Sequence, residues 1–359
     1  MQTRLARRTF LKSTALGVAA LAAPAVHAAE PTGAKIKLGQ IGVGHAHATK
    51  LEVYRRSGDY EVVGVVEPDK DLRERAAGLA AYRDLPWLTE EQLLGVDGLQ
   101  VVAVETRVRD LLATAQRCIA AGKHMHLDKP AGQSLPQYRQ LLAAAAERKL
   151  LVQMGYMYRY NPGVLLMRQA LREGWLGEIF EVHTVMSKVV PPADREKLAE
   201  FPGGIMFELG CHVIDLVIGV LGKPDRVHAY PRKSGAHEDG LVDNMLAVLE
   251  YPQATATVKS TALEVDGGSR RHLVVCGTSG TCHIQPLDAP SVRLTLDRDR
   301  GEYRRGTREI PFGDYQRYAG DAADMARILR GEKECDYPYS HDLAVQETVL
   351  RASGVSIEG

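Results

Sequence analysis

The feature that most constrains the fold is a regular alternation of short β-branched runs and helical stretches over residues 35–156. The expected strands are Ile36–Ile41, Glu61–Val66, Leu99–Val104, His124–Leu127 and Leu150–Met154. The expected helices are Ala46–Ser57, Asp69–Ala77, Thr89–Leu94, Arg107–Ala121 and Ser134–Glu147. Strand, helix, strand in this rhythm is typical of βαβ units, which place parallel strands in one sheet with helices on both faces. Residues 34–156 are therefore expected to form a doubly wound α/β domain of the Rossmann type.

The pattern changes after residue 161. Longer alternating runs, such as Leu241–Tyr251 and Ala254–Leu263, accompany helical segments at Pro162–Glu173 and Met206–Leu221. This pattern predicts an open, mostly antiparallel sheet with helices on one face. Since 359 residues are enough for two hydrophobic cores, residues 157–359 are expected to form a second α/β domain for substrate binding and oligomerisation.

Residues 1–28 have the features of an export signal. Arg7 and Arg8 precede an apolar stretch at Ala15–Ala25, and Val26-His27-Ala28 offers small residues for cleavage. The apolar stretch is about half of the ~20 residues that a membrane-spanning helix needs. A cleaved twin-arginine signal is therefore favoured over a membrane anchor, and we expect a periplasmic or secreted protein with no membrane contact after cleavage.

Composition excludes several classes of protein. The chain has 45 Lys+Arg against 45 Asp+Glu, so it has no basic excess with which to neutralise nucleic-acid phosphates. Five cysteines are too few for a disulfide scaffold in a chain of this length. Cys276 and Cys282 flank a turn, but as hairpin partners they would be out of register, so no bridge is expected between them.

A glycine-containing loop follows the first expected strand. Gly42 permits a tight turn, and Gly44 lets the backbone approach a pyrophosphate group at the start of the next helix. The third glycine position of the dinucleotide-binding pattern holds His47. Glu67 ends the second strand, where a carboxylate can bind ribose hydroxyls and repel a 2′-phosphate. The loop and Glu67 thus favour NAD over NADP, although a solvated strand end remains an alternative for Glu67.

Lys129 follows the fourth expected strand. Ligands of open parallel sheets bind outside the carboxyl ends of the strands, so this position places Lys129 at the binding crevice. The alternative is an ordinary surface lysine.

The segment 203–215 has the densest group of reactive side chains. On a continuous helix, Glu208, His212 and Asp215 would share one face. A histidine beside a carboxylate is suited to general acid–base catalysis, and a close-packed helix with a satisfied histidine is the alternative. A zinc site from Glu208, Cys211 and His212 is not expected, because adjacent helical residues diverge by about 100°.

Taken in order, these motifs resemble those of the glucose–fructose oxidoreductase, inositol dehydrogenase and MocA-like (Gfo/Idh/MocA) family. The motifs are the Gly-x-Gly loop, Asp128-Lys129-Pro130, the run from Gly155 to Pro162, the glycine-rich Glu/His helix and the Gly277–Gly280 turn. The resemblance implies a Rossmann domain, an open-sheet domain, bound NAD and a homo-oligomer.

The resemblance also implies roles for individual residues. Lys129 matches a lysine that contacts the substrate and the nicotinamide edge, and His212 matches the histidine that takes the proton from the substrate hydroxyl. The implied cofactor contacts are Gly42, Val43, Gly44, His45, Glu67, Thr106, Asp128 and Lys129. The implied substrate contacts are Lys129, Arg159, Glu208, His212 and Asp215. Glu208 stands where an aspartate is common, and Asp128 stands where a glutamate is common.

The leading functional hypothesis is an NAD-dependent oxidoreductase acting on a secondary alcohol or ketone of a sugar, cyclitol or related polyol. His212 would be the general base, oriented by Glu208 or Asp215, and Lys129 would stabilise the alkoxide. One alternative is redox-neutral elimination or glycoside cleavage with a tightly bound NAD. A second alternative is a non-catalytic sugar-binding relative.

Overall fold

The computed structural model describes residues 33–357, which belong to one compact unit. The expected export signal at residues 1–28 lies outside the described residues. Two sheets organise the unit, one of five strands and one of eight. Among the described residues, none of the helices has the length and apolar character required to cross a membrane.

The five-stranded sheet is parallel throughout, in the order β2-β1-β3-β4-β5. Its strands are β1 (Ile36–Ile41), β2 (Tyr60–Val66), β3 (Leu99–Val104), β4 (His124–Leu127) and β5 (Val152–Met154). Its connections contain η1 (Ala48–Lys50), α1 (Leu51–Arg56), α2 (Lys70–Ala77), α3 (Glu90–Leu94), α4 (Val108–Ala120) and α5 (Leu135–Glu147). The predicted parallel α/β fold is confirmed. The chain reverses its direction of winding between β1 and β3, so the loops after these two strands flank the switch point.

The eight-stranded sheet has the order β13-β12-β11-β10-β6-β9-β8-β7 and is antiparallel except for the β6–β9 pair. Its strands are β6 (Ile179–Val185), β7 (Arg226–Arg232), β8 (Asn244–Glu250), β9 (Thr255–Thr261), β10 (His272–Gly277), β11 (Gly280–Ile284), β12 (Ser291–Leu296) and β13 (Gly306–Pro311). The accompanying helices are η2 (Met157–Tyr160), α6 (Pro162–Arg172), α7 (Pro192–Ala199), η3 (Met206–Gly210), α8 (Cys211–Leu221), α9 (Ala319–Leu329) and α10 (Tyr339–Ala352). The prediction of a mostly antiparallel sheet is confirmed.

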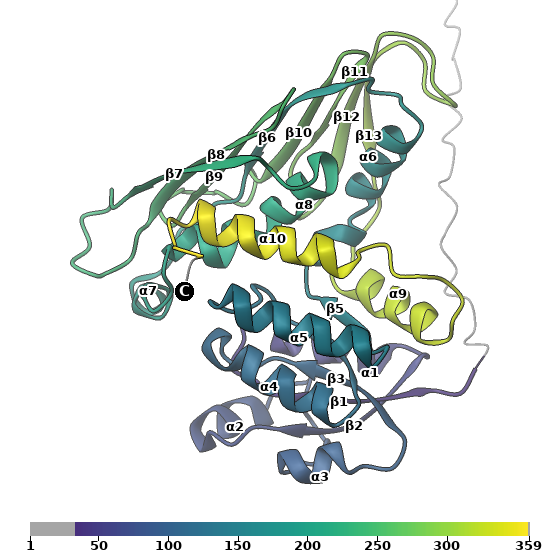
Figure 1. Ribbon diagram of the computed structural model, residues 1–359, viewed down its shortest axis with the longest axis vertical. Coiled ribbons are helices and arrows are strands. Elements are labelled where there is room, and N and C mark those ends of the chain that lie inside the picture. Colours follow the sequence, from purple (N-terminus) through teal and green to yellow (C-terminus); the bar gives the residue numbers. More distant parts are fainter. Residues whose placement is uncertain (1–32, 358–359) are drawn as a thin grey trace, which may run out of the picture. The chain divides into compact units, whose positions relative to one another are not determined.

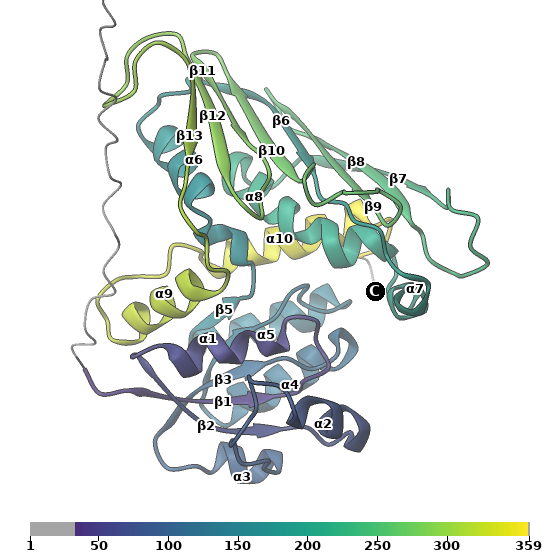
Figure 2. The same ribbon diagram turned by 180° about the vertical axis from the view of Figure 1, so that it is seen from behind.

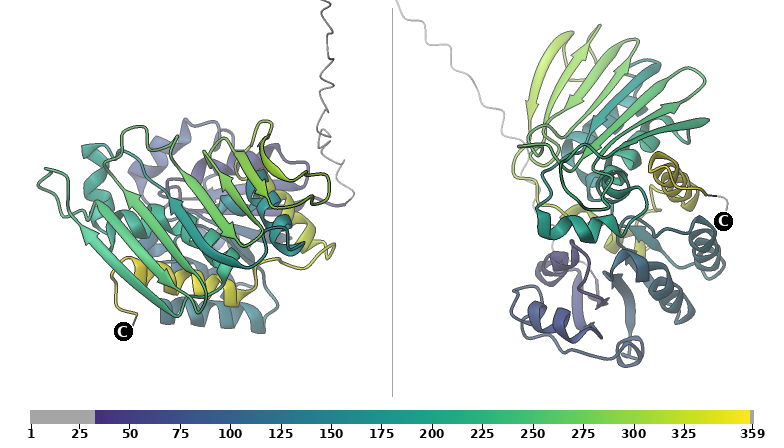
Figure 3. Two further views of the ribbon diagram at one scale, coloured as in Figure 1. Left: turned by 90° about the horizontal axis from the view of Figure 1, so that it is seen from above. Right: turned by 90° about the vertical axis from the view of Figure 1, so that its left-hand side faces the viewer.

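Helices cover one face of the large sheet. Figures 1 and 2 show α6 and α8 against this face, with α10 running between the large sheet and α5. Figure 3 shows that no helix within residues 33–357 lies over the opposite face. Along β8, the side chains of Met245, Ala247 and Leu249 are buried, and they alternate with half-buried neighbours. The helix-covered face therefore supplies the core, as period-two strands require.

The helix expected over Met206–Leu221 consists of two parts. Residues Met206–Gly210 form a π-helical turn, and α8 begins at Cys211. At Gly210, a Cβ atom would lie 2.5 Å from the Met206 sulfur, so a larger side chain would displace Met206. The wider π turn changes the angular spacing of the side chains, and such turns are frequent at functional sites.

No bridge joins Cys276 and Cys282, as expected. Cys276 pairs across the β10–β11 hairpin with Thr281, whereas Cys282 pairs with Val275. All five cysteines of the chain lie in the described region and are unbridged.

Gly42 has a backbone conformation that a side chain would oppose. Its φ angle is +91°, and a Cβ atom there would lie 2.5 Å from the Thr106 backbone nitrogen. The loop after β1 therefore packs directly on the loop after β3 at the switch point.

Replacing Gly42 with alanine should lower the free energy of unfolding by roughly 3 kcal/mol, because it adds a left-handed φ penalty to a backbone overlap. Urea denaturation measures the loss. Gly78→Ala is the matched control, since Gly78 has a helical φ of −80° and open space around its Cβ position. Its effect should stay within about 1 kcal/mol, and equal losses in both variants would refute the role of Gly42.

Candidate active site

Asp128 lies at the carboxyl end of β4 and is fully buried. Its Oδ2 atom is 2.8 Å from the Lys50 ammonium and 2.9 Å from His45 Nδ1. Its Oδ1 atom accepts a hydrogen bond from the Lys129 backbone N–H at 2.6 Å and lies 3.3 Å from His47 Nδ1. Although burial raises the pKa of this carboxyl, the charges of His45 and Lys50 outweigh burial and hold the pKa well below its usual range. Asp128 is therefore an anion that joins the glycine loop to β4.

Lys50 connects Asp128 with two further buried groups. The Lys50 ammonium lies 3.0 Å from Glu105 Oε1 and 2.8 Å from His126 Nε2. Burial lowers the pKa of Lys50, but Asp128 and Glu105 raise it by more, so the ammonium keeps its charge. The pKa of His126 falls to about 3, first because of burial and then because of Lys50, so His126 is neutral.

The pKa of Glu105 is raised well above its usual value, because the carboxyl is buried and faces the negative charge of Asp128. The charge of Lys50 only partly offsets these two effects. Beyond the Lys50 contact at Oε1, Glu105 has no hydrogen-bond partner for its Oε2 atom among the described residues.

Lys129 connects the two sheets. Its ammonium donates to the Glu208 backbone oxygen at 2.7 Å and lies 3.3 Å from Glu208 Oε1. The lysine is buried, which lowers its pKa, but Glu208, Cys211 and Asp128 raise the pKa by more. In turn, Lys129 and Lys188 outweigh burial and lower the pKa of Glu208 to about 2. The prediction that Lys129 lies at the crevice is consistent with these contacts, and Lys129 is not a surface lysine.

His212 stands against this ion pair from the second turn of the same helical segment. Its ring lies 5.7 Å from the His47 ring and 5.5 Å from the Tyr158 ring, centroid to centroid. Burial, followed by the charges of Lys129 and His47, holds the pKa of His212 well below its usual value. The Nδ1 atom of His212 is buried without a hydrogen-bond partner among the described residues. The structure therefore places a neutral, uncommitted imidazole beside a buried ammonium.

The expected orientation of His212 by Glu208 or Asp215 is wrong. Glu208 binds Lys129 instead, and Asp215 binds Arg159, with Arg159 Nη2 2.6 Å from Asp215 Oδ1. The expectation assumed a continuous α-helix, whereas the π turn rotates Glu208 relative to His212.

Among the described residues, no hydrogen bond joins Arg159 or Asp215 to Lys129 or His212. Arg159 is buried, bonds Asp342 as well at 2.6 Å, and stacks over the Tyr337 ring with a separation of 4.0 Å. His341 Nε2 lies 3.1 Å from Asp215. This network ties η2 to α8 and α10, so its contacts give no support to the substrate-binding role predicted for Arg159 and Asp215.

The glycine loop fits a dinucleotide. Gly42 and the Thr106 backbone leave no room for a side chain where the two loops meet, and Thr106 Oγ1 is buried without a partner among the described residues. Glu67 is not a solvated strand end. Its carboxylate accepts hydrogen bonds from the N–H groups of Val43 at 2.9 Å and Asp69 at 3.0 Å, which places it at the loop where ribose hydroxyls are expected.

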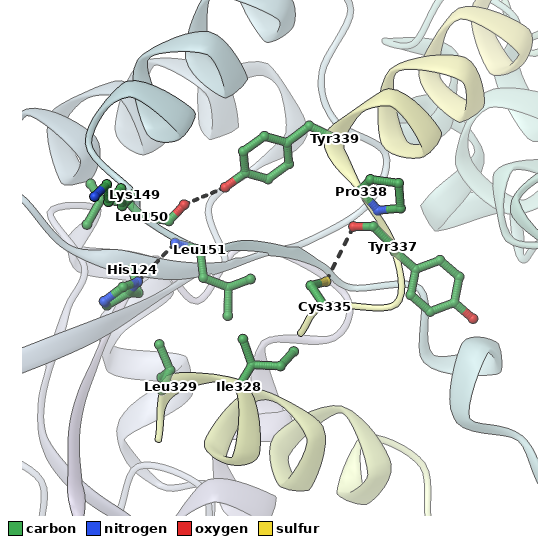
Figure 4. Close-up of a pocket in the computed structure, with 10 residues that line it drawn as sticks. All are labelled: His124, Lys149, Leu150, Leu151, Ile328, Leu329, Cys335, Tyr337, Pro338 and Tyr339. Atoms are coloured by element: carbon green, nitrogen blue, oxygen red, sulfur yellow. Dashed lines mark hydrogen bonds between the residues drawn. The ribbon is translucent and has the colours of Figure 1, made fainter. Parts of the chain in front are cut away.

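A cavity of about 360 Å³ lies elsewhere, between the start of β4, α9 and the segment 335–339 (Figure 4). His124, at the amino end of β4, lines it, so it lies at the opposite strand end from Asp128. Polar groups that line the cavity form hydrogen bonds with one another. The Leu151 N–H donates to His124 Nδ1, and the Cys335 thiol donates to the Tyr337 carbonyl oxygen. Because ligands of parallel sheets bind at the carboxyl ends of the strands, this cavity is not the candidate site.

Several members of the buried network are not predictable from motifs in the sequence. Lys50, Glu105, His126 and the side-chain contacts of His47 were not singled out. A signal for His126 existed, because it stands two residues before Asp128 in a buried strand and so shares its face. Lys50 carried no comparable signal, since its burial depends on contacts with the ends of two strands, β3 and β4, that are distant in sequence.

Comparisons with known proteins agree with this geometry. Residues 36–156 match an oxidoreductase family described as having an NAD-binding Rossmann fold, and residues 164–283 match the GFO/IDH/MocA C-terminal domain. A trans-1,2-dihydrobenzene-1,2-diol dehydrogenase from Bos taurus is 28% identical over 208 residues, which cover 57% of this chain and 60% of the relative. The matched region thus spans less than two thirds of that relative's length.

Solved structures show the same fold. An NAD-binding oxidoreductase from Klebsiella pneumoniae has a TM-score of 0.78 and 16% identity, covering 90% of this chain and 97% of its own. GenD2 from gentamicin A biosynthesis, solved in complex with NAD, has a TM-score of 0.70 and 23% identity, covering 89% of this chain and 94% of its own.

The lowered pKa of Glu208 predicts an acid-sensitive contribution to stability. The carboxyl has a pKa of about 2 in the folded chain against 4.5 ordinarily, so its stabilisation is complete above pH 4.5 and is lost as the pH falls toward 2. The wild-type protein should lose roughly 2 kcal/mol of unfolding free energy from this group between pH 5.5 and pH 3. Chemical denaturation across this range should give a flatter pH dependence for Glu208→Gln.

Glu196→Gln, at an exposed position in α7, is the control and should keep the wild-type slope. A wild-type slope in Glu208→Gln would contradict the Lys129–Glu208 ion pair.

Proposed function

The chain belongs to the Gfo/Idh/MocA family of NAD(P)-binding oxidoreductases, and from this premise we propose that it oxidises or reduces a secondary alcohol or ketone of a sugar, cyclitol or related polyol. The observation that carries the proposal is the pairing of a buried ammonium, Lys129, with a buried neutral imidazole, His212, at the carboxyl end of the parallel sheet. A reacting CH–OH group needs both a proton acceptor and a cation near its oxygen.

In the oxidation direction, His212 takes the proton of the substrate hydroxyl. Its lowered pKa keeps it unprotonated at neutral pH, and its unpartnered Nδ1 atom leaves the ring free of a competing hydrogen bond. Lys129 stabilises the negative charge that develops on the substrate oxygen. The nicotinamide, when bound, supplies the hydride acceptor.

Glu208 acts as a positioning residue in this scheme. Its backbone oxygen and carboxylate both hold the Lys129 ammonium, so the ammonium is fixed before substrate arrives. This assignment differs from the expected one, in which Glu208 served His212. Preorganised cations of this kind stabilise developing charge without a cost of reorientation.

The proposed substrate class follows from a chemical group that diols, sugars and cyclitols have in common. The Bos taurus relative is named for a trans-1,2-diol, and sugars and cyclitols also carry secondary hydroxyls on neighbouring carbons. We therefore expect substrates with vicinal secondary hydroxyls.

Export remains part of the proposal. Residues 1–28 predict twin-arginine transport, which carries folded proteins, so the protein would take its NAD with it across the membrane. Fractionation of cells that express the full chain should recover the protein from the periplasm, and an exclusively cytoplasmic product would refute export.

Replacing Lys129 with Met, or His212 with Gln, should each lower kcat for polyol oxidation by about 10²–10⁴-fold, because each removes a group that acts on the reacting oxygen. Steady-state kinetics with a panel of sugars and cyclitols measures the loss, and thermal melting confirms that the variants fold. His228→Gln, a half-exposed histidine on β7 paired with Glu250, is the matched control. Full activity in either site variant would contradict the proposal.

A further inference from the structure

Three side chains next to Lys129 have the geometry of a metal site. His45, His47 and Asp128 each offer a ligand atom, and these atoms lie within 4.8 Å of one another. His45 Nδ1 is 2.9 Å from Asp128 Oδ2, and His47 Nδ1 is 3.3 Å from Asp128 Oδ1. Two ligands that each lie about 2.1 Å from one ion are about 3.0–3.4 Å apart at angles of 90–109°. The observed separations are therefore close to those of neighbouring ligands around a single ion.

Contacts at both nitrogens hold the ring of His45 in place beside Asp128. Its Nε2 atom lies 2.9 Å from the Lys129 carbonyl oxygen, to which only an N–H group can donate. Its Nδ1 atom accepts a hydrogen bond from the His47 backbone N–H at 3.2 Å. His45 Nδ1 also lies 2.9 Å from Asp128 Oδ2, so a proton or a bound cation between these two atoms would join them. Metal-binding histidines are typically held in this way, through a bond from the other ring nitrogen to a carbonyl.

The buried carboxyl groups at these ligands also outnumber the lysines that bind them. Asp128 and Glu105 are two fully buried carboxyl groups, and the Lys50 ammonium is the one lysine bound to them among the described residues. Glu105 Oε1 is paired with Lys50 at 3.0 Å, whereas Oε2 has no hydrogen-bond partner in the described chain and lies 3.9 Å from His45 Nδ1. A buried carboxylate oxygen without a partner is costly, and a bound cation removes that cost.

We propose that His45, His47 and Asp128, completed by Glu105, bind one divalent transition-metal ion. Two imidazole nitrogens with carboxylate oxygens suit Zn²⁺ or Co²⁺, whereas Mg²⁺ and Ca²⁺ prefer oxygen ligands alone. The site differs from the Glu208, Cys211 and His212 set considered from the sequence, whose cysteine donates instead to the Glu208 carbonyl at 3.2 Å. The proposal concerns ion binding and does not depend on which substrate the enzyme converts.

The test uses the full chain without a histidine tag. The protein is stripped with a chelator, equilibrated with Zn²⁺ or Co²⁺, separated from free ion and analysed for metal. The expected result is one ion per chain, with visible d–d absorption for Co²⁺ that indicates nitrogen and oxygen ligands. Less than a tenth of an ion per chain under saturating Zn²⁺ would overturn the proposal, as would equal binding of Mg²⁺ at the same site.

Substitutions test which residues bind the ion. His47→Gln should weaken Zn²⁺ binding at least tenfold, and Asp128→Asn should do the same, with thermal melting to confirm that each variant is folded. His183→Gln is the control, because His183 is an exposed histidine on β6, on a different sheet from the proposed ligands. Unchanged affinity in folded His47→Gln would overturn the assignment. Since ion binding is measured without turnover, an inactive protein that binds one Zn²⁺ would refute the proposed function and leave the metal site standing.

Discussion

The candidate site depends on one buried anion, Asp128. A carboxylate removed from water is stable only if cations and N–H groups surround it, and here those partners come from separate parts of the chain. Lys50 comes from the end of the glycine loop, His45 and His47 come from the loop itself, and the Lys129 N–H comes from the residue that follows. The switch point of the parallel sheet is thereby assembled around a single charge, and loss of that charge would leave several buried cationic or polar groups without a partner.

The same region connects the two sheets. Lys129 follows Asp128 directly, and its ammonium crosses to Glu208 on the π turn that precedes α8. His212 therefore approaches the parallel sheet from the side of the large sheet, and burial, followed by the charges of Lys129 and His47, holds the pKa of its imidazole well below the usual value. Lys129 from the parallel sheet and His212 from α8 are thus brought to the same helical segment, which begins with the π turn that holds the ammonium. Arg159 and Asp215 stabilise this arrangement from within the interior rather than by contact with the site.

Much of the fold was predictable, because hydrophobic periodicity is a local property. The bounds of β1, β3 and β4 agree with those expected from the sequence. The strands β7, β11, β12 and β13 were not predicted. Of these, β7 and β13 lie at the sheet edges and are largely exposed, so they lack a buried apolar face. The site was predictable where a motif marks the end of a strand, as at Lys129. It was not predictable where partners depend on the tertiary structure: the π turn redirected Glu208, and the burial of Lys50 follows from its contacts with the ends of two strands, β3 and β4.

The most direct test of the central claim is the protonation state of His212, followed by NMR of ¹⁵N-histidine-labelled protein during a pH titration. His212→Gln assigns the signal, and Lys129→Met tests the effect of the neighbouring charge. The account predicts that the His212 imidazole stays neutral from pH 8 down to pH 5, and that its midpoint rises in Lys129→Met. A wild-type His212 that titrates near pH 6.5 would contradict the arrangement of a buried base beside a buried ammonium.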